Sequence, residues 1–455
     1  MLTIQKKLTN SFYAILSLPA TAMGFALSIQ IAVLSWILST KYNLDIHQVG
    51  IVWAAGPIAG IMGQVIIGLI SDKTWFWGGR RRPFILIGGT LAALMIVALP
   101  NISEINDFLG IGSLMSVAIV IAVTLDMAIN ISFNPTRSLI ADVTPEGTPR
   151  TKGYTWMQTI SGFFGVFAYV FGAVFGNYML IYVGAAITLI FSIIPIFFIK
   201  EPVTLDIVVE GEVEQIRRKT NWKSNFKSFI ANFYSLHSIR MMFVNALVNI
   251  VKAEKKWRYL LRVYLAHSFT WLGIQTMFVF VFAYISQFQF NITDLSILNI
   301  DQKNEVGQII AIAFAIFNIV GFILPASVLQ PLTKKIGTIY THIICVFIMA
   351  IGYWCIVFFG NTTIMLYTLM AIVGIGWASV VSLPFAIVSE MVDKTKMGFF
   401  MGIFNLSVVI PQLIVSLYIG SFIQAANDKV LIFIISAVSL TISGFLWFLV
   451  KKKND

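Results

Sequence analysis

The sequence predicts an all-α membrane protein with twelve transmembrane helices arranged in two halves of six. Three observations point to this fold class. The chain has 455 residues, of which 58% are hydrophobic and 11% charged, with a mean hydropathy of +0.87, whereas soluble domains are about 25% charged. The apolar residues form runs long enough to cross a bilayer, and one long polar stretch separates six runs from six. A water-exposed surface needs more polar residues than this, so the composition excludes an ordinary soluble enzyme.

A transmembrane helix needs about 20 mainly apolar residues to cross the hydrocarbon layer, which is roughly 30 Å thick. Twelve segments have this length, and the fifth and sixth divide near Asn177. The predicted spans are 12–39, 47–71, 83–100, 112–141, 155–177, 178–199, 262–287, 305–330, 339–359, 363–390, 398–424 and 430–450.

These spans divide the chain into three regions. Residues 1–199 form a predicted N-terminal six-helix bundle, and residues 262–455 form a C-terminal one. Residues 200–261 are rich in Lys and Arg and predict a cytoplasmic linker, with an amphipathic helix at the membrane surface around 222–250. A nucleic-acid-binding arm is the remote alternative for this stretch. Two six-helix halves joined by a linker are typical of transporters built from an internal repeat.

The distribution of basic residues predicts that both termini are cytoplasmic. With that orientation only Lys41, Lys303 and Lys429 lie in outside loops, Arg137 lies within a span, and the other 27 of the 31 basic residues face the inside. This asymmetry is the one that the positive-inside rule requires. The net charge of +11 is therefore explained by membrane orientation, and no nucleic-acid partner is expected. The short loops favour a multi-pass protein of a bacterial inner membrane.

Enzymatic and metal-binding motifs are absent from the sequence. Cys345 and Cys355 lie in one apolar segment, and the four histidines are scattered, so neither a disulfide nor a metal site is expected. No Walker loop, HExxH or GxSxG pattern occurs. We expect neither an enzyme nor an organic cofactor.

The fourth predicted span carries charged residues at bilayer depth, where an ionisable group costs at least about 2.5–3.5 kcal/mol and usually marks function. At 100° per residue, Asp126, Asn130 and Arg137 share one helix face, but Asp126 and Arg137 are about 16 Å apart along the helix, too far for an ion pair. Burial disfavours the charged form of a carboxyl group, so Asp126 is expected to bind and release a proton near neutral pH. Its alternative role is a neutral hydrogen-bonding group between helices. For Arg137 the alternatives are contact with substrate hydroxyls, extension to the interface, or pairing with Asp142.

Further polar and aromatic residues within the spans are candidates for binding a neutral polyol, because amides bond hydroxyl groups and aromatic rings stack on sugar CH faces. For each amide, a hydrogen bond between helices is the alternative, and for each tryptophan, a position in the interfacial belt. With Asn130 and Arg137, the predicted substrate-binding residues are Gln30, Gln64, Gln158, Trp271, Gln275, Asn405 and Gln412.

Charged residues at the inside turn after the second span predict a latch that changes during gating. This turn carries Asp72 and the arginines Arg80, Arg81 and Arg82, and the matching turn of the second half carries only Lys334 and Lys335. An acid in such a turn can pair with cations of a neighbouring helix. Asp142, at the inside end of the fourth span, is the second acidic residue of the predicted latch. The alternative is plain positive-inside charge.

Several of these stretches resemble the glycoside-pentoside-hexuronide cation symporters, which have a major-facilitator-type fold, and within them the plant sucrose–proton symporters and their bacterial and animal relatives. The more specific stretches are Gly79-Arg-Arg-Arg-Pro-Phe-Ile85 and the block from Asp126 to Asp142. Supporting stretches are 52–60, 68–72, 382–389 and 401–412.

The resemblance implies proton-coupled symport of an α-glucoside such as sucrose or maltose by alternating access. It implies that Asp126 carries the proton, the coupling ion, and that Arg137 is required for sugar transport. One segment departs from the plant proteins: residues 270–287 lack their acidic Phe-Asp-Thr-Asp-type sequence, which puts plant-like sucrose specificity in doubt.

The main alternatives are sodium-coupled symport and uniport. A lone carboxylate favours H⁺, because Na⁺ usually requires several oxygen ligands. A membrane-embedded enzyme and a transporter-like sensor are alternatives from other classes. The expected partners are a small neutral sugar and the lipid bilayer, and we expect a monomer.

Overall fold

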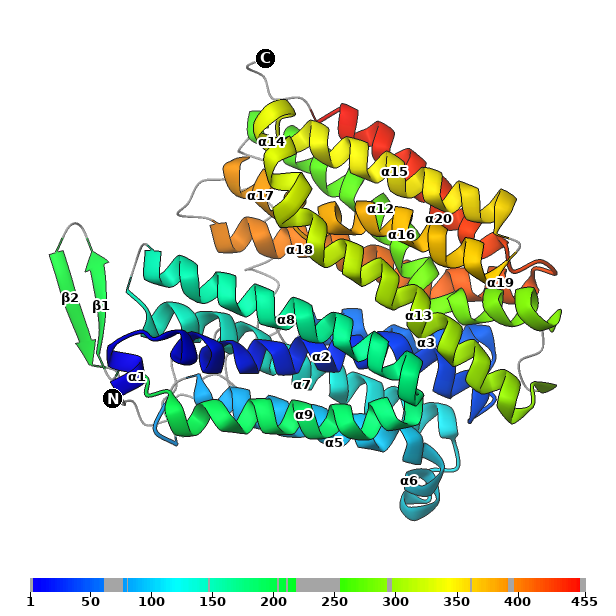
Figure 1. Ribbon diagram of the computed structural model, residues 1–455, viewed down its shortest axis with the longest axis horizontal. Helices are drawn as coiled ribbons and strands as arrows, with labels where there is room; N and C mark the ends of the chain where they lie inside the picture. Colours follow the sequence, from blue (N-terminus) through cyan, green and yellow to red (C-terminus); the bar gives the residue numbers. More distant parts are fainter. Residues whose placement is uncertain are drawn as a thin grey trace.

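The computed structural model describes residues 3–60, 77–79, 81–145, 148–202, 204–209, 212–217, 254–292, 297–360, 362–391 and 397–450. These residues form two groups of roughly parallel helices that lie against each other (Figure 1). The two described ends of the chain lie toward the same end of the molecule (Figure 1), which we call the termini end. Among the described residues, eleven helices are long and apolar enough to cross a membrane.

The N-terminal group contains the helices up to residue 198. They are α1 (Thr3–Lys6), α2 (Asn10–Thr40), α3 (Ile46–Trp53), α5 (Arg82–Ala98), α6 (Ile102–Leu109), α7 (Leu114–Val143), α8 (Thr148–Phe175) and α9 (Asn177–Phe198). A 3₁₀ turn, Leu99–Asn101, joins α5 to α6.

The C-terminal group begins at residue 254. Its helices are α12 (Glu254–Phe290), α13 (Ile300–Leu324), α14 (Gln330–Ile336), α15 (Thr338–Phe359), α16 (Thr363–Val380), α17 (Leu383–Met391), α18 (Met397–Ile414), α19 (Gly420–Ala425) and α20 (Leu431–Phe448). Two π-helical segments, Pro325–Leu329 and Val415–Ile419, join α13 to α14 and α18 to α19.

Most predicted spans coincide with these helices, and the differences arise at their ends. The split near Asn177 is confirmed, because Gly176 has a φ of +85° and separates α8 from α9. The additional helix α6, which follows a turn containing Pro100, was not anticipated between the predicted spans 83–100 and 112–141. The second predicted span, 47–71, begins with α3 and extends beyond the described residues after position 60.

Side-chain caps explain where several helices begin. Asp45 and Gln48 form a capping box at the start of α3, and Asn299 and Gln302 form another at the start of α13. In each box one side chain accepts a hydrogen bond from a backbone N–H group that the first helical turn leaves unpaired.

The predicted linker contains regular structure at both of its ends. Strands β1 (Thr204–Val209) and β2 (Glu212–Arg217) pair antiparallel with Thr204 opposite Arg217, a hairpin that the sequence analysis did not anticipate. Helix α12 begins at Glu254, eight residues before the predicted span. The amphipathic helix expected around 222–250 lies outside the described residues.

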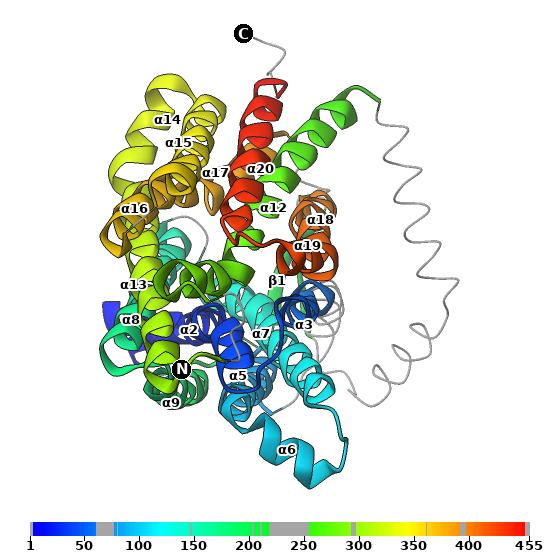
Figure 2. The ribbon, with the colours of Figure 1, turned by 90° about the vertical axis from the view of Figure 1, so that its right-hand side faces the viewer.

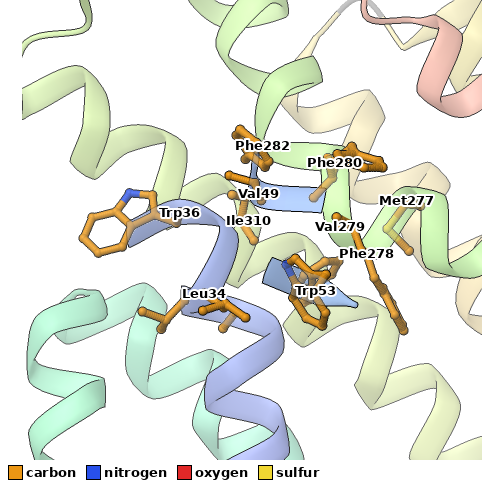
Figure 3. Packing of buried hydrophobic residues seen from close by; sticks show 14 of the residues in the cluster. Leu34, Trp36, Val49, Trp53, Met277, Phe278, Val279, Phe280, Phe282 and Ile310 are labelled. Atoms are coloured by element: carbon orange, nitrogen blue, oxygen red, sulfur yellow. The ribbon is translucent and has the colours of Figure 1, made fainter. Parts of the chain in front are cut away.

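A single buried apolar cluster crosses the boundary between the two groups. It includes Trp53 of α3, Phe278 and Phe280 of α12, and Ile310 of α13 (Figure 3). The backbones approach closely where α3 meets the segment before α19, since a Cβ atom at Gly50 would lie 2.8 Å from the carbonyl oxygen of Ser416. In Figure 2 the blue α3 lies beside the orange α19. The two groups thus contact each other through α3 and α19 at the end of the molecule away from the termini.

Candidate substrate and proton site

Asp126 lies on α7 inside the N-terminal group, with 7% of its surface exposed. Its carboxylate accepts a hydrogen bond of 2.9 Å from Nε2 of Gln30 on α2. The backbone at Gly56 also faces this carboxylate, and a Cβ atom added to Gly56 would lie only 3.3 Å from Oδ2 of Asp126. No basic side chain within the described ranges forms a salt bridge with Asp126. The site is therefore a buried carboxyl group held by an amide and faced by a glycine.

Gln30 has only one of its two polar atoms paired. Its Nε2 group binds Asp126, but its Oε1 atom is buried and has no hydrogen-bond partner among the described residues. A buried acceptor without a donor is costly. Gln30 was predicted as one of several scattered amides, and the structure places it directly on the carboxylate.

Asn130 and Arg137 follow Asp126 along α7. The Nδ2 group of Asn130 donates to the backbone oxygen of Asp126 at 2.8 Å. The Arg137 guanidinium lies 4.7 Å from the centre of the Phe133 ring and is exposed. It lies near the C-terminal end of α7, and a cation–π contact contributes to its position.

The predicted pairing of Arg137 with Asp142 was one alternative, and the structure pairs Asp142 with Arg81 instead. Nε of Arg81 lies 3.2 Å from the Asp142 carboxylate. This ion pair joins the start of α5 to the end of α7. Two members of the predicted latch are thus brought together.

A residue that the sequence analysis missed, Glu201, lies at the same place. Its carboxylate accepts hydrogen bonds of 2.8 to 3.0 Å from the backbone N–H groups of Arg81 and Arg82, where α5 begins. An acid at a helix N-terminus satisfies unpaired donors and complements the helix dipole. The Arg82 side chain donates to the carbonyl oxygen of Ile196 on α9. The only signal in the sequence was an acid directly after the sixth span.

On the side of Asp126 away from the termini, a chain of two hydrogen bonds joins α3 to α2 and α2 to the C-terminal group. Nε1 of Trp53 donates to Oγ of Ser35 at 2.8 Å, and this hydroxyl donates to the carbonyl oxygen of Val279 on α12, also at 2.8 Å. Trp53 and Val279 lie close together in Figure 3. Trp53 is three residues from Gly56, so this contact lies about one turn along the chain from the glycine that faces Asp126. Ser35 and Val279 were not predicted as site residues.

In the C-terminal group, the predicted amides Gln275 and Gln412 lie together. Nε2 of Gln412 donates to Oε1 of Gln275 at 3.1 Å, which joins α18 to α12. Trp271 donates from Nε1 to Nε2 of His267 at 2.9 Å, and His267 stacks on Phe404. These contacts fix the orientation of the Trp271 ring, of which part remains exposed.

The remaining predicted residues are dispersed. Asn405 is half-buried on α18, and Gln158 is exposed on α8. Gln64, Asp72 and Arg80 lie outside the described residues. Tyr169 of α8, which was not predicted, forms side-chain hydrogen bonds with Ser28 of the same group and Asn318 of the other. Within the described ranges, no group of three or more His, Cys, Asp or Glu residues could hold a metal ion.

Two groups of helices long enough to span a membrane, with a buried carboxyl group inside the first group, are typical of multi-pass membrane transporters rather than enzymes. The family model described as Major Facilitator Superfamily matches residues 16–416, and the chain belongs to this family. Solved structures with the same fold include the inward open xylose transporter XylE from E. coli, at 14% identity with a TM-score of 0.62 over 98% of this chain and 97% of that one. The nucleoside transporter NupG is similar at 12% identity, with a TM-score of 0.64 over 98% of this chain and 100% of that one.

Similarity to curated proteins is confined to part of the chain. Sucrose transport protein SUC4 of Arabidopsis thaliana is 31% identical over 123 residues, which are 26% of this chain and 23% of that protein. The general alpha-glucoside permease of Schizosaccharomyces pombe is 32% identical over 128 residues, 27% of this chain and 23% of that protein. The matched segments thus cover about a quarter of these relatives. They confirm the resemblance to sucrose transporters found in the sequence.

Proposed function

We propose that the protein is a secondary active transporter that couples the movement of an α-glucoside, a sucrose- or maltose-like disaccharide, to the movement of a proton. The observation that supports coupling is the buried carboxyl group of Asp126, whose hydrogen-bond partner is the neutral amide of Gln30. A proton that binds there neutralises a charge in a medium of low dielectric constant, where an isolated charge is expensive. Protonation therefore changes the energy of moving this site between the two faces of the membrane.

The substrate class is supported by the names of the partially matching relatives and by polar groups on α2 and α7, the helices that form the Asp126 site. Arg137, Asn130 and the Oε1 atom of Gln30 offer both donors and acceptors to sugar hydroxyls. The C-terminal group contributes amides and an aromatic ring for a sugar CH face. The residues proposed there are Trp271, Gln275, Asn405 and Gln412, and Gln64 and Gln158 are proposed from the sequence.

Alternating access requires contacts that close one side of the site and open when the other side closes. We assign this role to the Trp53–Ser35–Val279 contact on one side and to the latch of Arg81, Asp142 and Glu201 on the other. Asp72, Arg80 and Arg82 belong to the proposed latch as well. The membrane that we propose is a bacterial inner membrane, with both termini cytoplasmic, the protein a monomer and no cofactor other than the coupling proton.

The test is sugar uptake by proteoliposomes under an imposed pH gradient. Asp126→Asn is expected to abolish uphill accumulation while retaining exchange of labelled sugar across the membrane. Asp107→Asn, at an exposed acid of α6, is the matched control and should transport normally. Arg137→Lys keeps the charge but loses the planar fork, so sugar transport should weaken.

Four outcomes would contradict parts of this proposal. Undiminished proton-driven accumulation by Asp126→Asn would exclude Asp126 as the coupling residue. Accumulation that follows a sodium gradient and ignores the pH gradient would establish sodium coupling. Equilibration without accumulation under either gradient would establish a uniporter, and binding of sugar without any flux would indicate a sensor.

A further inference from the structure

The axis of the short helix α6 is not parallel to the axes of the long helices. In Figure 1 it turns away from the end of α5, and in Figure 2 it projects from the side of the molecule. Helix α5 has 17 residues and is therefore about 25 Å long, close to the thickness of the hydrocarbon layer. The turn into α6 thus occurs where α5 reaches the bilayer surface at the end away from the termini.

The bend between α5 and α6 is fixed by specific contacts. Pro100 lies in the 3₁₀ turn between them and has no N–H group to continue the helix. The Tyr42 hydroxyl lies across the break, where it donates to the carbonyl oxygen of Leu99 and accepts from the N–H of Ile102, both at 2.9 Å. Lys41 donates to the carbonyl oxygen of Pro100 and lies 4.0 Å from Glu104. The orientation of α6 is therefore set by the end of α2.

Helix α6 is amphipathic. At 100° per residue, Ile105, Phe108 and Leu109 fall within one arc of about 100°, and Ser103, Glu104 and Asp107 fall within the opposite arc. The apolar arc is not covered by protein at its far end, since Phe108 is 88% exposed and Leu109 is 57% exposed.

The chain then returns to α7 through a turn that adds to this surface. Gly110 and Gly112 have φ values of +63° and +74°, in the left-handed region that favours glycine. Between them Ile111 is 47% exposed and extends the apolar arc of α6. Asn106 accepts a hydrogen bond from the N–H of Ser113 at 3.0 Å, which holds the turn against the helix.

We propose that α6 lies in the plane of the bilayer surface, with Phe108, Leu109 and Ile111 inserted among the acyl chains and Glu104 and Asp107 facing water. An amphipathic helix at the edge of a membrane-spanning bundle is positioned to bury its apolar face in this way. Its polar face carries acids and no Lys or Arg. Insertion is therefore driven by the apolar side chains and does not require anionic lipids.

This anchoring acts on the part of the molecule where the two groups meet. Tyr42 and Lys41, which hold α6, directly follow α2, and Ser35 of α2 bonds Val279 of the other group. The bilayer surface therefore fixes the end of α2 that contributes to the Trp53–Ser35–Val279 contact. The inference requires only that the chain spans a membrane and does not depend on the substrate.

The test is the accessibility of spin labels in nanodiscs of phosphatidylcholine. In a background with Cys345→Ala and Cys355→Ala, a nitroxide is attached at Phe108→Cys or at the matched control Asp107→Cys on the polar arc. Oxygen concentrates in lipid and a nickel chelate stays in water, so the ratio of oxygen to nickel accessibility should be several-fold higher at position 108 than at position 107. Adding anionic lipid should leave both ratios unchanged.

A second pair keeps Phe108 in place, in case its removal releases the helix. Leu109→Cys and Ser103→Cys should show the same difference in accessibility. Equal ratios within both pairs, or higher nickel accessibility on the apolar arc, would show that α6 extends into water and would overturn the proposal.

Discussion

The amide of Gln30 on α2 donates a hydrogen bond of 2.9 Å to the carboxylate of Asp126 on α7, 96 residues away in the sequence. Both residues are buried, and the other polar atom of the amide has no partner among the described residues. The amide holds the charged form of the carboxyl group. A protonated carboxyl group instead needs an acceptor, which the same amide supplies if it rotates by 180°. The pair therefore has two arrangements that differ by one proton.

Replacing Gln30 by Met keeps the volume of the side chain but removes the donor. A hydrogen bond to a charged group contributes about 1.5–3 kcal/mol, so Gln30→Met should reduce the maximal rate of proton-driven uptake at least tenfold. Gln330→Met is the control, because Gln330 is exposed on α14 and belongs to no proposed site. Equal uptake by both variants would show that the amide does not act on Asp126.

The space beside Asp126 gives a steric prediction. A methyl group at Gly56 would lie 3.3 to 3.5 Å from all three atoms of the carboxyl group, whereas one at Gly60 would meet no atom of the described residues within 4 Å. Gly56→Ala should therefore lower the rate of sugar uptake several-fold, and Gly60→Ala should not. Uptake and thermal unfolding temperature measured on both purified proteins separate crowding of the site from loss of folding. A normal rate for Gly56→Ala would mean that the carboxyl group can shift without cost.

The hydroxyl of Ser35 connects the two groups of helices. Ser35→Ala removes the acceptor of Trp53 and the donor to Val279, each hydrogen bond contributing about 1 kcal/mol. We expect the population to shift toward conformations that are open at this end, seen as longer label-to-label distances between α3 and α19 by electron spin resonance. Ser39→Ala, one turn further along α2, is the control, because its buried hydroxyl has no partner among the described residues. Unchanged distances in Ser35→Ala would exclude this contact as a gate.

Glu201 should stabilise the N-terminal group through the start of α5. Glu201→Ala removes an acceptor for the N–H groups of Arg81 and Arg82, and since an unsatisfied buried donor costs about 1–3 kcal/mol, the midpoint of thermal unfolding should fall. Glu201→Gln keeps one acceptor oxygen and loses the charge, so it should lie between Glu201→Ala and the wild type. If Gln and Ala variants unfold at the same temperature as the wild type, the carboxylate does not cap α5.

Helix positions were predictable because they depend on local composition. Runs of about 20 apolar residues are sufficient to place most spans, and Gly176 marks the division between α8 and α9. The prediction failed at α6, because eight amphipathic residues are too few to produce a hydropathy signal. It also missed the hairpin of β1 and β2 within the basic linker.

The sequence by itself determined which residues share a helix face. The 3.6-residue period places Asp126 and Asn130 together, and membrane depth identifies Asp126 as costly and therefore functional. These conclusions need only the geometry of one helix and the energy of burying a charge.

Only the tertiary structure decided which residues of different helices meet. In the sequence, Gln30 was one of several equivalent amides, and only the packing of α2 against α7 places it on Asp126. Packing also brings Asp142 against Arg81 of α5, and it brings Glu201, which follows α9, to the start of α5. The physical reason is that hydrogen bonds and ion pairs act over about 3 Å. The rotation and offset of one helix against another are set by side-chain packing along their whole length, which no single segment of sequence contains.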